Sequence, residues 1–415
     1  MQEKMNYLDF DIAIEKSLDL VKSTNQTEFV SIFDALNRVL SMDIICKKNV
    51  PSFDNSAMDG FAFKACSSGK TLKIKKTIFA GDKIDDKLES LGEDECYKIM
   101  TGAIVPSLVD TVIAYEQCLD ITENSVKIPN DVKIGSNLRI KGEELKEGEV
   151  ILKKGESINS SSIAILASQG ISVIEVYKQI SIAVLSTGNE LKEPWQKADE
   201  DEIYNCNSIG IIAQLKEKNF NATYCGVIPD DLEKSISFIQ NLKNYDVVIT
   251  TGGISMGDAD FVAKAFLENG LDIAFHGVNI KPGRPMMMGK MNNTLVVSLP
   301  GNPLTAMINI SLFVIPLLKK LQGDRAFYHT FVKVINKSEF KTKKGRTNIV
   351  LGKLDNSIFE VARQNKYGSG MITILYESNA IFVTKDEKSF TSKDEEIKLV
   401  LLNGEFSDKK SDFLN

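Results

Sequence analysis

The sequence predicts a multidomain α/β protein, in which one doubly wound α/β domain is flanked by segments rich in short strands. Residues 180–325 alternate short apolar runs with helical patterns, which is typical of a parallel sheet covered by helices on both faces. Residues 71–135, and those from 328 onward, instead carry short strands separated by Gly and Asp turns. A chain of 415 residues is too long to fold around a single hydrophobic core, so we expect two to four domains.

Composition and charge argue against several classes of protein. Hydrophobic residues make up 43% and charged residues 26%, and the net charge is −6. There is no Lys/Arg cluster of the kind that binds nucleic acid, and neither a signal-like N-terminus nor an apolar run of membrane-spanning length. Six widely spaced cysteines indicate reduced thiols. We therefore expect a cytoplasmic protein without nucleic-acid or membrane partners. With only two histidines, any catalytic metal should have oxygen ligands.

The N-terminal part shows helical spacing in residues 8–22 and again, as a second amphipathic segment, in residues 28–40. A turn-rich loop at residues 50–63 then leads into a strand and carries Asp54 and Asp59. The Asp59-Gly60 pair is equally consistent with an ordinary turn.

Residues 71–135 read as a small β-rich insertion, with a hydroxyl, Thr101, and a glycine at one strand end. Residues 138–144 form a charged turn, and residues 160–170 form a helix that ends at a glycine. A strand is expected to follow at residues 171–176.

The stretch from Asp246 to Phe261 is the clearest candidate for a binding site. An apolar strand leads into a loop with Gly252, Gly253 and Ser255, and then into a helix. Glycines allow a ligand close to the backbone, and a helix N-terminus favours anions. Asp258 and Asp260 beside the loop suit a phosphate accompanied by Mg²⁺. A plain strand-to-helix turn with Asp as N-cap is the alternative, and the absence of a following lysine excludes a P-loop.

Four further loops follow strand ends, and we expect all five to converge at one edge of the sheet. They are residues 187–190, residues 230–231, residues 281–284 with Lys281 and Arg284, and residues 300–303 with Pro300 and Pro303. The two cations could also be ordinary surface charges, and the Pro-Gly-Asn-Pro turn could serve only to begin a helix. Met286, Met287 and Met288 are predicted to fill the core. Short strands return after residue 328, and the tail from Glu405 should fray.

Several of these segments together resemble the molybdopterin molybdenumtransferase family, which includes bacterial MoeA and the E domain of gephyrin. In the α/β part they are residues 186–191, 250–258, 281–285 and 299–303, and in the N-terminal part residues 51–60, 100–103 and 139–144. The resemblance runs in order from about residue 8 to about residue 400. Related adenylyltransferases and CinA-like proteins share the glycine-rich loop but not the motif of residues 54–60.

The resemblance implies four domains and a homodimer. It implies a discontinuous linker domain (1–48 and 138–178), a β-rich inserted domain (49–137), a molybdopterin-binding α/β domain (179–325) and a C-terminal β barrel-like domain (326–405). The cleft would lie between the α/β domain of one subunit and the inserted domain of the other. A molybdopterin adenylyltransferase is implied as the upstream partner.

The implied reaction consumes adenylylated molybdopterin and molybdate, requires Mg²⁺ and releases AMP. The motifs assign catalysis and metal binding to four acids, Asp59, Glu190, Asp230 and Asp260. They assign substrate binding to Thr101, Glu144, Thr187, Gly252, Gly253, Ser255, Asp258, Lys281, Arg284, Pro300, Pro303 and Ser369.

Two departures from the family pattern stand out. Gly277 occupies a position that is often basic, so His276 or Arg284 could supply the missing charge. Leu351-Gly352 replaces a common Arg-Gly pair, which leaves Arg346 and Ser369 as nearby candidates. A scaffold protein with reduced catalysis and a paralogue that inserts tungstate remain the alternatives.

Overall fold

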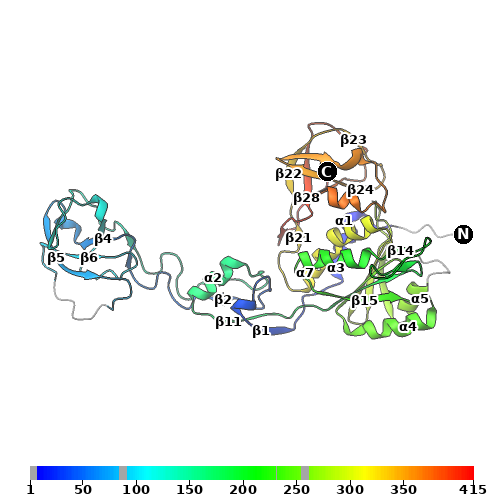
Figure 1. Cartoon of the computed structure of the whole chain (residues 1–415), viewed down its shortest axis with the longest axis horizontal. Coiled ribbons are helices and arrows are strands. Elements are labelled where there is room, and N and C mark those ends of the chain that lie inside the picture. Colours follow the sequence, from blue (N-terminus) through cyan, green and yellow to red (C-terminus); the bar gives the residue numbers. More distant parts are fainter. Residues whose placement is uncertain (1–6, 84–90, 230, 254–260) are drawn as a thin grey trace. The chain divides into compact units, whose positions relative to one another are not determined.

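The structure is a computed structural model that describes residues 7–83, 91–229, 231–253 and 261–415. The chain divides into two compact units, shown in Figure 1. One consists of Met1–Met42, Lys154–Ile163 and Ser172–Asn415, and the other of Asp43–Lys153 and Ala164–Ile171. The four predicted domain boundaries stay a prediction.

The smaller unit is built on a five-stranded sheet in the order β7-β4-β6-β5-β8. Only the β5–β6 pair is parallel. All four residues of the interior strand β4 are buried, with Phe61 and Phe63 in one apolar cluster and Ala62 in another, as expected when side chains alternate between two covered faces. The strands are β4 (Gly60–Phe63), β5 (Thr71–Ile78), β6 (Glu95–Ile99), β7 (Thr111–Ala114) and β8 (Ser125–Lys127), which confirms the predicted β-rich segment.

Two short ribbons carry the chain into and out of this sheet. They pair β2 (Ile44–Ile45) with β10 (Val150–Leu152), and β3 (Asn55–Ser56) with β9 (Leu138–Arg139). The predicted helix is α2 (Ser160–Ser168), which Gly170 follows at φ +67°.

The larger unit contains the predicted doubly wound domain. Its sheet has the order β15-β12-β16-β20-β19-β17, in which β19 runs antiparallel to both of its neighbours and the other five strands run in one direction. Alternate residues of β16 enter different cores: Val247 and Ile249 face one, and Val248 faces the other. The strands are β12 (Ile182–Thr187), β15 (Ala222–Ile228), β16 (Val247–Thr251), β17 (Leu271–His276), β19 (Met287–Met291) and β20 (Thr294–Leu299).

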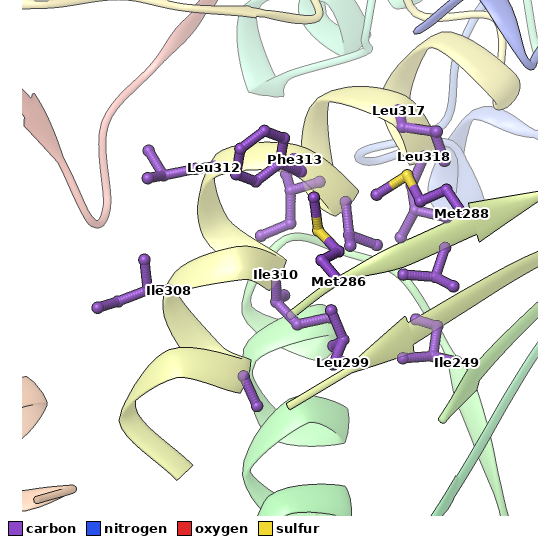
Figure 2. Packing of buried hydrophobic residues seen from close by; sticks show 14 of the residues in the cluster. Ile249, Met286, Met288, Leu299, Ile308, Ile310, Leu312, Phe313, Leu317 and Leu318 are labelled. Carbon is purple, nitrogen blue, oxygen red and sulfur yellow. The ribbon is translucent and has the colours of Figure 1, made fainter. Parts of the chain in front are cut away.

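Helices cover both faces of this sheet (Figure 1). On one side lie α1 (Phe10–Asp19), α3 (Asn207–Glu217), α6 (Pro303–Asn309) and α7 (Ile315–Leu321), and on the other α4 (Leu232–Gln240) and α5 (Phe261–Glu268). Met286 and Met288 pack against the α6–α7 helix in Figure 2, and Met287 enters the opposite core, which confirms all three as core residues.

The segment from Pro303 to Leu321 is long and apolar enough to cross a membrane, but 78% of it is buried inside the structure. It is a core helix, and a π turn at Ile310–Val314 interrupts it just before Pro316. In that turn the Ile315 N–H donates to the Ile310 carbonyl.

The C-terminal part of the same unit is a closed barrel of five strands. β24 pairs with β25 and β26, and β22 and β28 complete the ring, while β18 pairs with the first two residues of β24. The strands are β18 (Ile280–Lys281), β22 (Val332–Asn336), β24 (Thr347–Asp355), β25 (Ile358–Val361), β26 (Ala380–Val383) and β28 (Glu396–Leu401). The remaining elements of this part are the ribbons β21 (Tyr328–His329) with β29 (Phe406–Ser407) and β23 (Phe340–Lys341) with β27 (Phe390–Thr391), and α8 (Thr373–Glu377).

Two predictions were wrong. The second amphipathic segment at residues 28–40 is not a helix: β1 (Thr27–Ser31) pairs with β11 (Val173–Tyr177), and a short 3₁₀ turn at Ile32–Asp34 follows. The distant partner strand overrides the local helical spacing. The tail does not fray either, because Phe413 is buried against Phe10, and Asn415 bonds to the backbone of Val383 and Lys398.

Candidate active site

A pocket of about 500 Å³ lies beyond the carboxyl ends of the parallel strands β12, β15, β16 and β20, and we call it the strand-end pocket. The loops that follow those strands form it, as expected for an open α/β sheet. The ribbon of β13 (Leu191–Lys192) and β14 (Ile203–Tyr204) forms one rim. Its lining consists of residues 187–191, 203–207, 228–229, 251–253, 261–262, 301 and 303.

The glycine-rich loop packs tightly against the loop after β12. Gly252 has φ +85°, and a Cβ there would lie 2.5 Å from Thr187 Oγ1 and 2.9 Å from the Thr187 carbonyl oxygen. The Gly252 N–H donates to the Leu299 carbonyl at 3.0 Å. This N–H is therefore used within the fold and is not a free donor for a phosphate, so the glycine serves close packing of the two loops.

A buried polar network supports the floor of the strand-end pocket. Ser186 Oγ donates to Asn205 Oδ1 at 2.9 Å and also contacts the hydroxyls of Ser208 and Thr251 at 2.6 Å and 3.3 Å. Asn205 Nδ2 donates to the Tyr224 hydroxyl at 2.9 Å. The strand ends are thereby tied to the start of α3, which fixes the pocket wall.

The outer end of this network is a pair formed by Tyr224 and Glu193. The Tyr224 hydroxyl donates to Glu193 Oε1. Burial, and then the hydrogen bond to Glu193, raise the pKa of Tyr224, so its hydroxyl stays protonated and remains a donor.

The turn formed by Pro300, Gly301, Asn302 and Pro303 separates the strand-end pocket from a second pocket. Asn207 Nδ2 donates to the Gly301 carbonyl at 2.8 Å and holds the turn against α3. Gly301 and Pro303 line the strand-end pocket, whereas Pro300 and Asn302 line the second one. The turn is therefore a shared wall.

The second pocket, which we call the basic pocket, has a volume of about 700 Å³ and lies between the α/β domain and the C-terminal barrel. Parallel pairing of β18 with β24 sets Lys281 opposite Asn348 and so brings the two parts together. Five cations line it, and in the described part of the chain none of them forms an ion pair. They are Lys281, Arg284, Lys341, Lys343 and Arg346. Such a wall favours an anion.

Asn348 holds the turn that presents two of these cations. Its Nδ2 donates to the carbonyl oxygens of Lys343 and Arg346 at 3.0 Å and 2.9 Å, and its Oδ1 accepts from the Lys343 N–H at 3.0 Å. Asn348 is 4% exposed, so these bonds are shielded from water. The cationic turn is therefore fixed before any ligand binds.

In the smaller unit, Asp59 and Thr101 form a clamp. The Thr101 N–H and hydroxyl both donate to Asp59 Oδ1, at 2.6 Å and 2.8 Å. These two bonds, the backbone one first, lower the pKa of Asp59, which stays ionised near neutral pH. Glu144 is exposed on the charged turn of the same unit.

Comparison with known proteins identifies two regions of the chain. Residues 8–170 match a model described as the MoeA N-terminal region (domain I and II), and residues 183–320 match a probable molybdopterin binding domain. A molybdopterin molybdenumtransferase of Haemophilus influenzae is 33% identical over 403 residues, covering 95% of this chain and 99% of that protein. The chain belongs to the molybdopterin molybdenumtransferase family.

Other members of the molybdopterin molybdenumtransferase family extend the match. The protein of that name from Staphylococcus aureus (strain COL) is 31% identical over 359 residues, covering 85% of this chain and 84% of its own length. The crystal structure of the molybdopterin biosynthesis MoeA protein from Pyrococcus horikoshii OT3 aligns with a TM-score of 0.82 at 27% identity, over 95% of this chain and 100% of that chain.

Within the larger unit, the described site residues that the sequence predicts line two pockets. Thr187, Glu190, Gly252, Gly253 and Pro303 line the strand-end pocket. Lys281, Arg284, Pro300 and Ser369 line the basic pocket. Asp59, Thr101 and Glu144 belong to the other compact unit. Asp230, Ser255, Asp258 and Asp260 lie outside the described residues.

Several residues that line or support the two pockets were not predicted from the sequence. Lys341 ends the short strand β23 and Lys343 follows it, which is typical of ordinary surface charge, and only the β18–β24 pairing reveals that both line the basic pocket. Asn205 and Asn207, which hold the pocket wall and the Pro300–Pro303 turn, are also absent from the residues predicted from sequence. Polar residues cluster at positions 205–208, directly after strand β14, and this cluster could have indicated a pocket wall.

Proposed function

We propose that the chain inserts molybdenum into adenylylated molybdopterin and releases AMP. The observation that carries the proposal is the shared Pro300–Pro303 wall, which lies between a pocket at the strand ends and a pocket lined by five unpaired cations among the described residues. A substrate bound in the strand-end pocket with its phosphoanhydride near this wall would lie next to an oxyanion bound in the basic pocket. The names of the relatives support the same reaction.

The two pockets suit different parts of this chemistry. The strand-end pocket takes the pterin and its phosphates beside the loop of Gly252 and Gly253. The basic pocket takes molybdate, because Lys281, Arg284 and Arg346 offer positive charge to a tetrahedral dianion, and the Ser369 side chain offers a neutral donor. Attack of water on the phosphoanhydride frees AMP and leaves the pterin phosphate. The two dithiolene sulfurs then bind molybdenum and displace one molybdate oxygen, which leaves as water with the two thiol protons.

We propose that Mg²⁺ binds beside the strand-end pocket. Glu190 is exposed on its rim, and a carboxylate oxygen is the hard donor that Mg²⁺ prefers. Within the described residues no cluster of three acids, histidines or cysteines occurs, and Asp230 and Asp260 fall outside them. We propose that Glu190, Asp230 and Asp260 hold the ion, which would offset phosphate charge when bound.

We also propose a homodimer that works in the cytoplasm and receives its substrate from a molybdopterin adenylyltransferase. Support comes from the family resemblance, which implies a cleft shared by two subunits, and from the Asp59–Thr101 clamp, which holds a preformed ionised acid. Such an acid would complete the cleft of a partner subunit.

The direct experiment incubates the purified chain with adenylylated molybdopterin, Mg²⁺ and molybdate, and follows AMP by chromatography and cofactor by reconstitution of an apo-molybdoenzyme. We expect AMP and active molybdoenzyme to appear together. Binding of the adenylylated pterin without AMP release at any molybdate concentration would instead support a scaffold. A parallel series with tungstate identifies the preferred oxyanion.

A further inference from the structure

The N-terminal segment reaches the wall of the basic pocket. Leu8 forms a parallel bridge with Val278, its N–H donates to the Gly277 carbonyl at 3.2 Å, and its carbonyl accepts from the Asn279 N–H at 2.7 Å. On the other side, the Val278 N–H donates to the Arg284 carbonyl at 3.0 Å. Backbone pairing therefore fixes Tyr7, the neighbour of Leu8, close to Arg284.

The Tyr7 ring and the Arg284 guanidinium stack on one another. The Arg284 Cζ lies 4.5 Å from the ring centroid, within the range of a cation–π interaction. Arg284 Nε is buried and has no hydrogen-bond partner among the described residues, while the residue lines the basic pocket. Among the described residues no carboxylate pairs with Arg284, so the Tyr7 ring is the contact that orients the planar cation.

Gly277 provides the space for this ring. Its φ is +90°, and a Cβ there would lie 2.7 Å from Tyr7 Cε1. A side chain at position 277 would therefore push the ring away from Arg284. Gly277, Tyr7 and Arg284 therefore depend on one another: the glycine leaves room for the ring, and the ring contacts the guanidinium.

We propose that Tyr7 is a positioning residue that holds the Arg284 guanidinium at the wall of the basic pocket, with its N–H groups available to a tetrahedral oxyanion. The inference rests on the proposed function of that pocket. Tyr7 acts through Arg284 and supplies the ring face, so its hydroxyl is dispensable. Without the ring, the arginine side chain would have to be ordered by the ligand, which weakens binding.

The test compares molybdate affinity, measured by titration calorimetry, for the natural protein, Tyr7→Phe, Tyr7→Leu and Gly277→Ala. We expect Tyr7→Phe to bind as the natural protein does, and Tyr7→Leu and Gly277→Ala to bind about tenfold more weakly. In an Arg284→Ala background, Tyr7→Leu should cause no further loss. Unchanged affinity in Tyr7→Leu, or an equal loss in the Arg284→Ala background, would overturn the proposal.

A second readout separates this inference from the function of the pocket. The Arg284 Nε–H resonance, assigned by its absence in Arg284→Lys, should show a ring-current shift that Tyr7→Leu abolishes and Tyr7→Phe keeps. If the natural protein binds no molybdate, the function proposed for the basic pocket fails. If the resonance is unaffected by Tyr7→Leu, the positioning of Arg284 by Tyr7 is overturned instead.

Discussion

At the residue scale, Gly252 shows why the glycine-rich loop needs its glycines. Its left-handed backbone and its closeness to Thr187 are separate constraints. Gly270 has nearly the same φ, +86°, but a Cβ there would meet nothing within 4 Å. Comparing substitutions at the two positions therefore distinguishes the effect of backbone strain from that of steric overlap.

We predict that Gly252→Ala destabilises the protein more than Gly270→Ala. Both variants place alanine at positive φ, which costs about 1–2 kcal/mol. Only Gly252→Ala also forces a methyl group against the backbone of Thr187, and we expect at least about 1 kcal/mol of further destabilisation. Calorimetric unfolding of the two variants makes the comparison, and equal melting temperatures would show that the loop gives way without cost.

His329 is a second residue whose environment sets a measurable property. Burial lowers its pKa to about 4, and the nearby backbone of Ser311 and Leu312 only partly opposes the shift. The ring packs against Phe406 and Phe413, with centroids 4.9 Å and 6.1 Å away. It is therefore neutral in the folded protein over most of the pH range.

We predict that stability falls as the pH drops from about 6.5 to about 4. In this window the unfolded chain binds a proton at His329 that the folded protein does not, so stability rises with pH. The full difference is about 3 kcal/mol. Urea unfolding at several pH values measures it. His329→Phe should remove this part of the slope, whereas His276→Gln, the other histidine in the sequence, should keep it.

At the element scale, the cationic turn before β24 depends on one buried side chain. Asn348 makes three hydrogen bonds to the backbone of Lys343 and Arg346, and another to Thr384 Oγ1 at 3.3 Å. Asn336, in β22, is equally buried and similarly bonds to the carbonyl oxygens of Ser338 and Ser392, but it does not line the basic pocket.

We predict that Asn348→Ala and Asn336→Ala each lower stability by about 2–4 kcal/mol, because each leaves buried backbone groups without partners. Only Asn348→Ala should also weaken molybdate binding, by about tenfold, since it frees the turn that presents Lys343 and Arg346. Denaturant unfolding and titration calorimetry measure the two quantities. Similar affinity losses in both variants would mean that stability alone governs binding.

The elements themselves were largely predictable, and the failures have a common cause. The strands of the α/β domain and of both β-rich parts follow local patterns of apolar residues, so their positions came out correctly. Residues 28–40 were wrong because β1 is specified by pairing with β11, far along the chain. The basic pocket could not be predicted for the same reason, because Lys281 and Arg346 are brought to one pocket only by the β18–β24 pairing.

At the scale of the whole molecule, the sequence predicted several domains and a family resemblance that the comparisons confirm. It did not predict that the loops after the strands separate into two pockets, because the Pro300–Pro303 turn acts as a wall only once Asn207 holds it. The acids assigned to one cleft also lie on two compact units, with Asp59 on one and Glu190 on the other.

The last prediction follows from that separation. If subunits share their clefts, a dimer of one Asp59→Asn subunit and one Glu190→Gln subunit has one cleft with both defects and one with neither. Each variant alone should release AMP about 100-fold more slowly, the scale of losing one preorganised charged group. An equal mixture after subunit exchange should recover about a quarter of natural activity, since half the dimers are mixed and each has one intact cleft. Differently tagged subunits report the exchange. If exchange is complete and AMP release stays at the level of the single variants, Asp59 and Glu190 do not serve one cleft across the dimer.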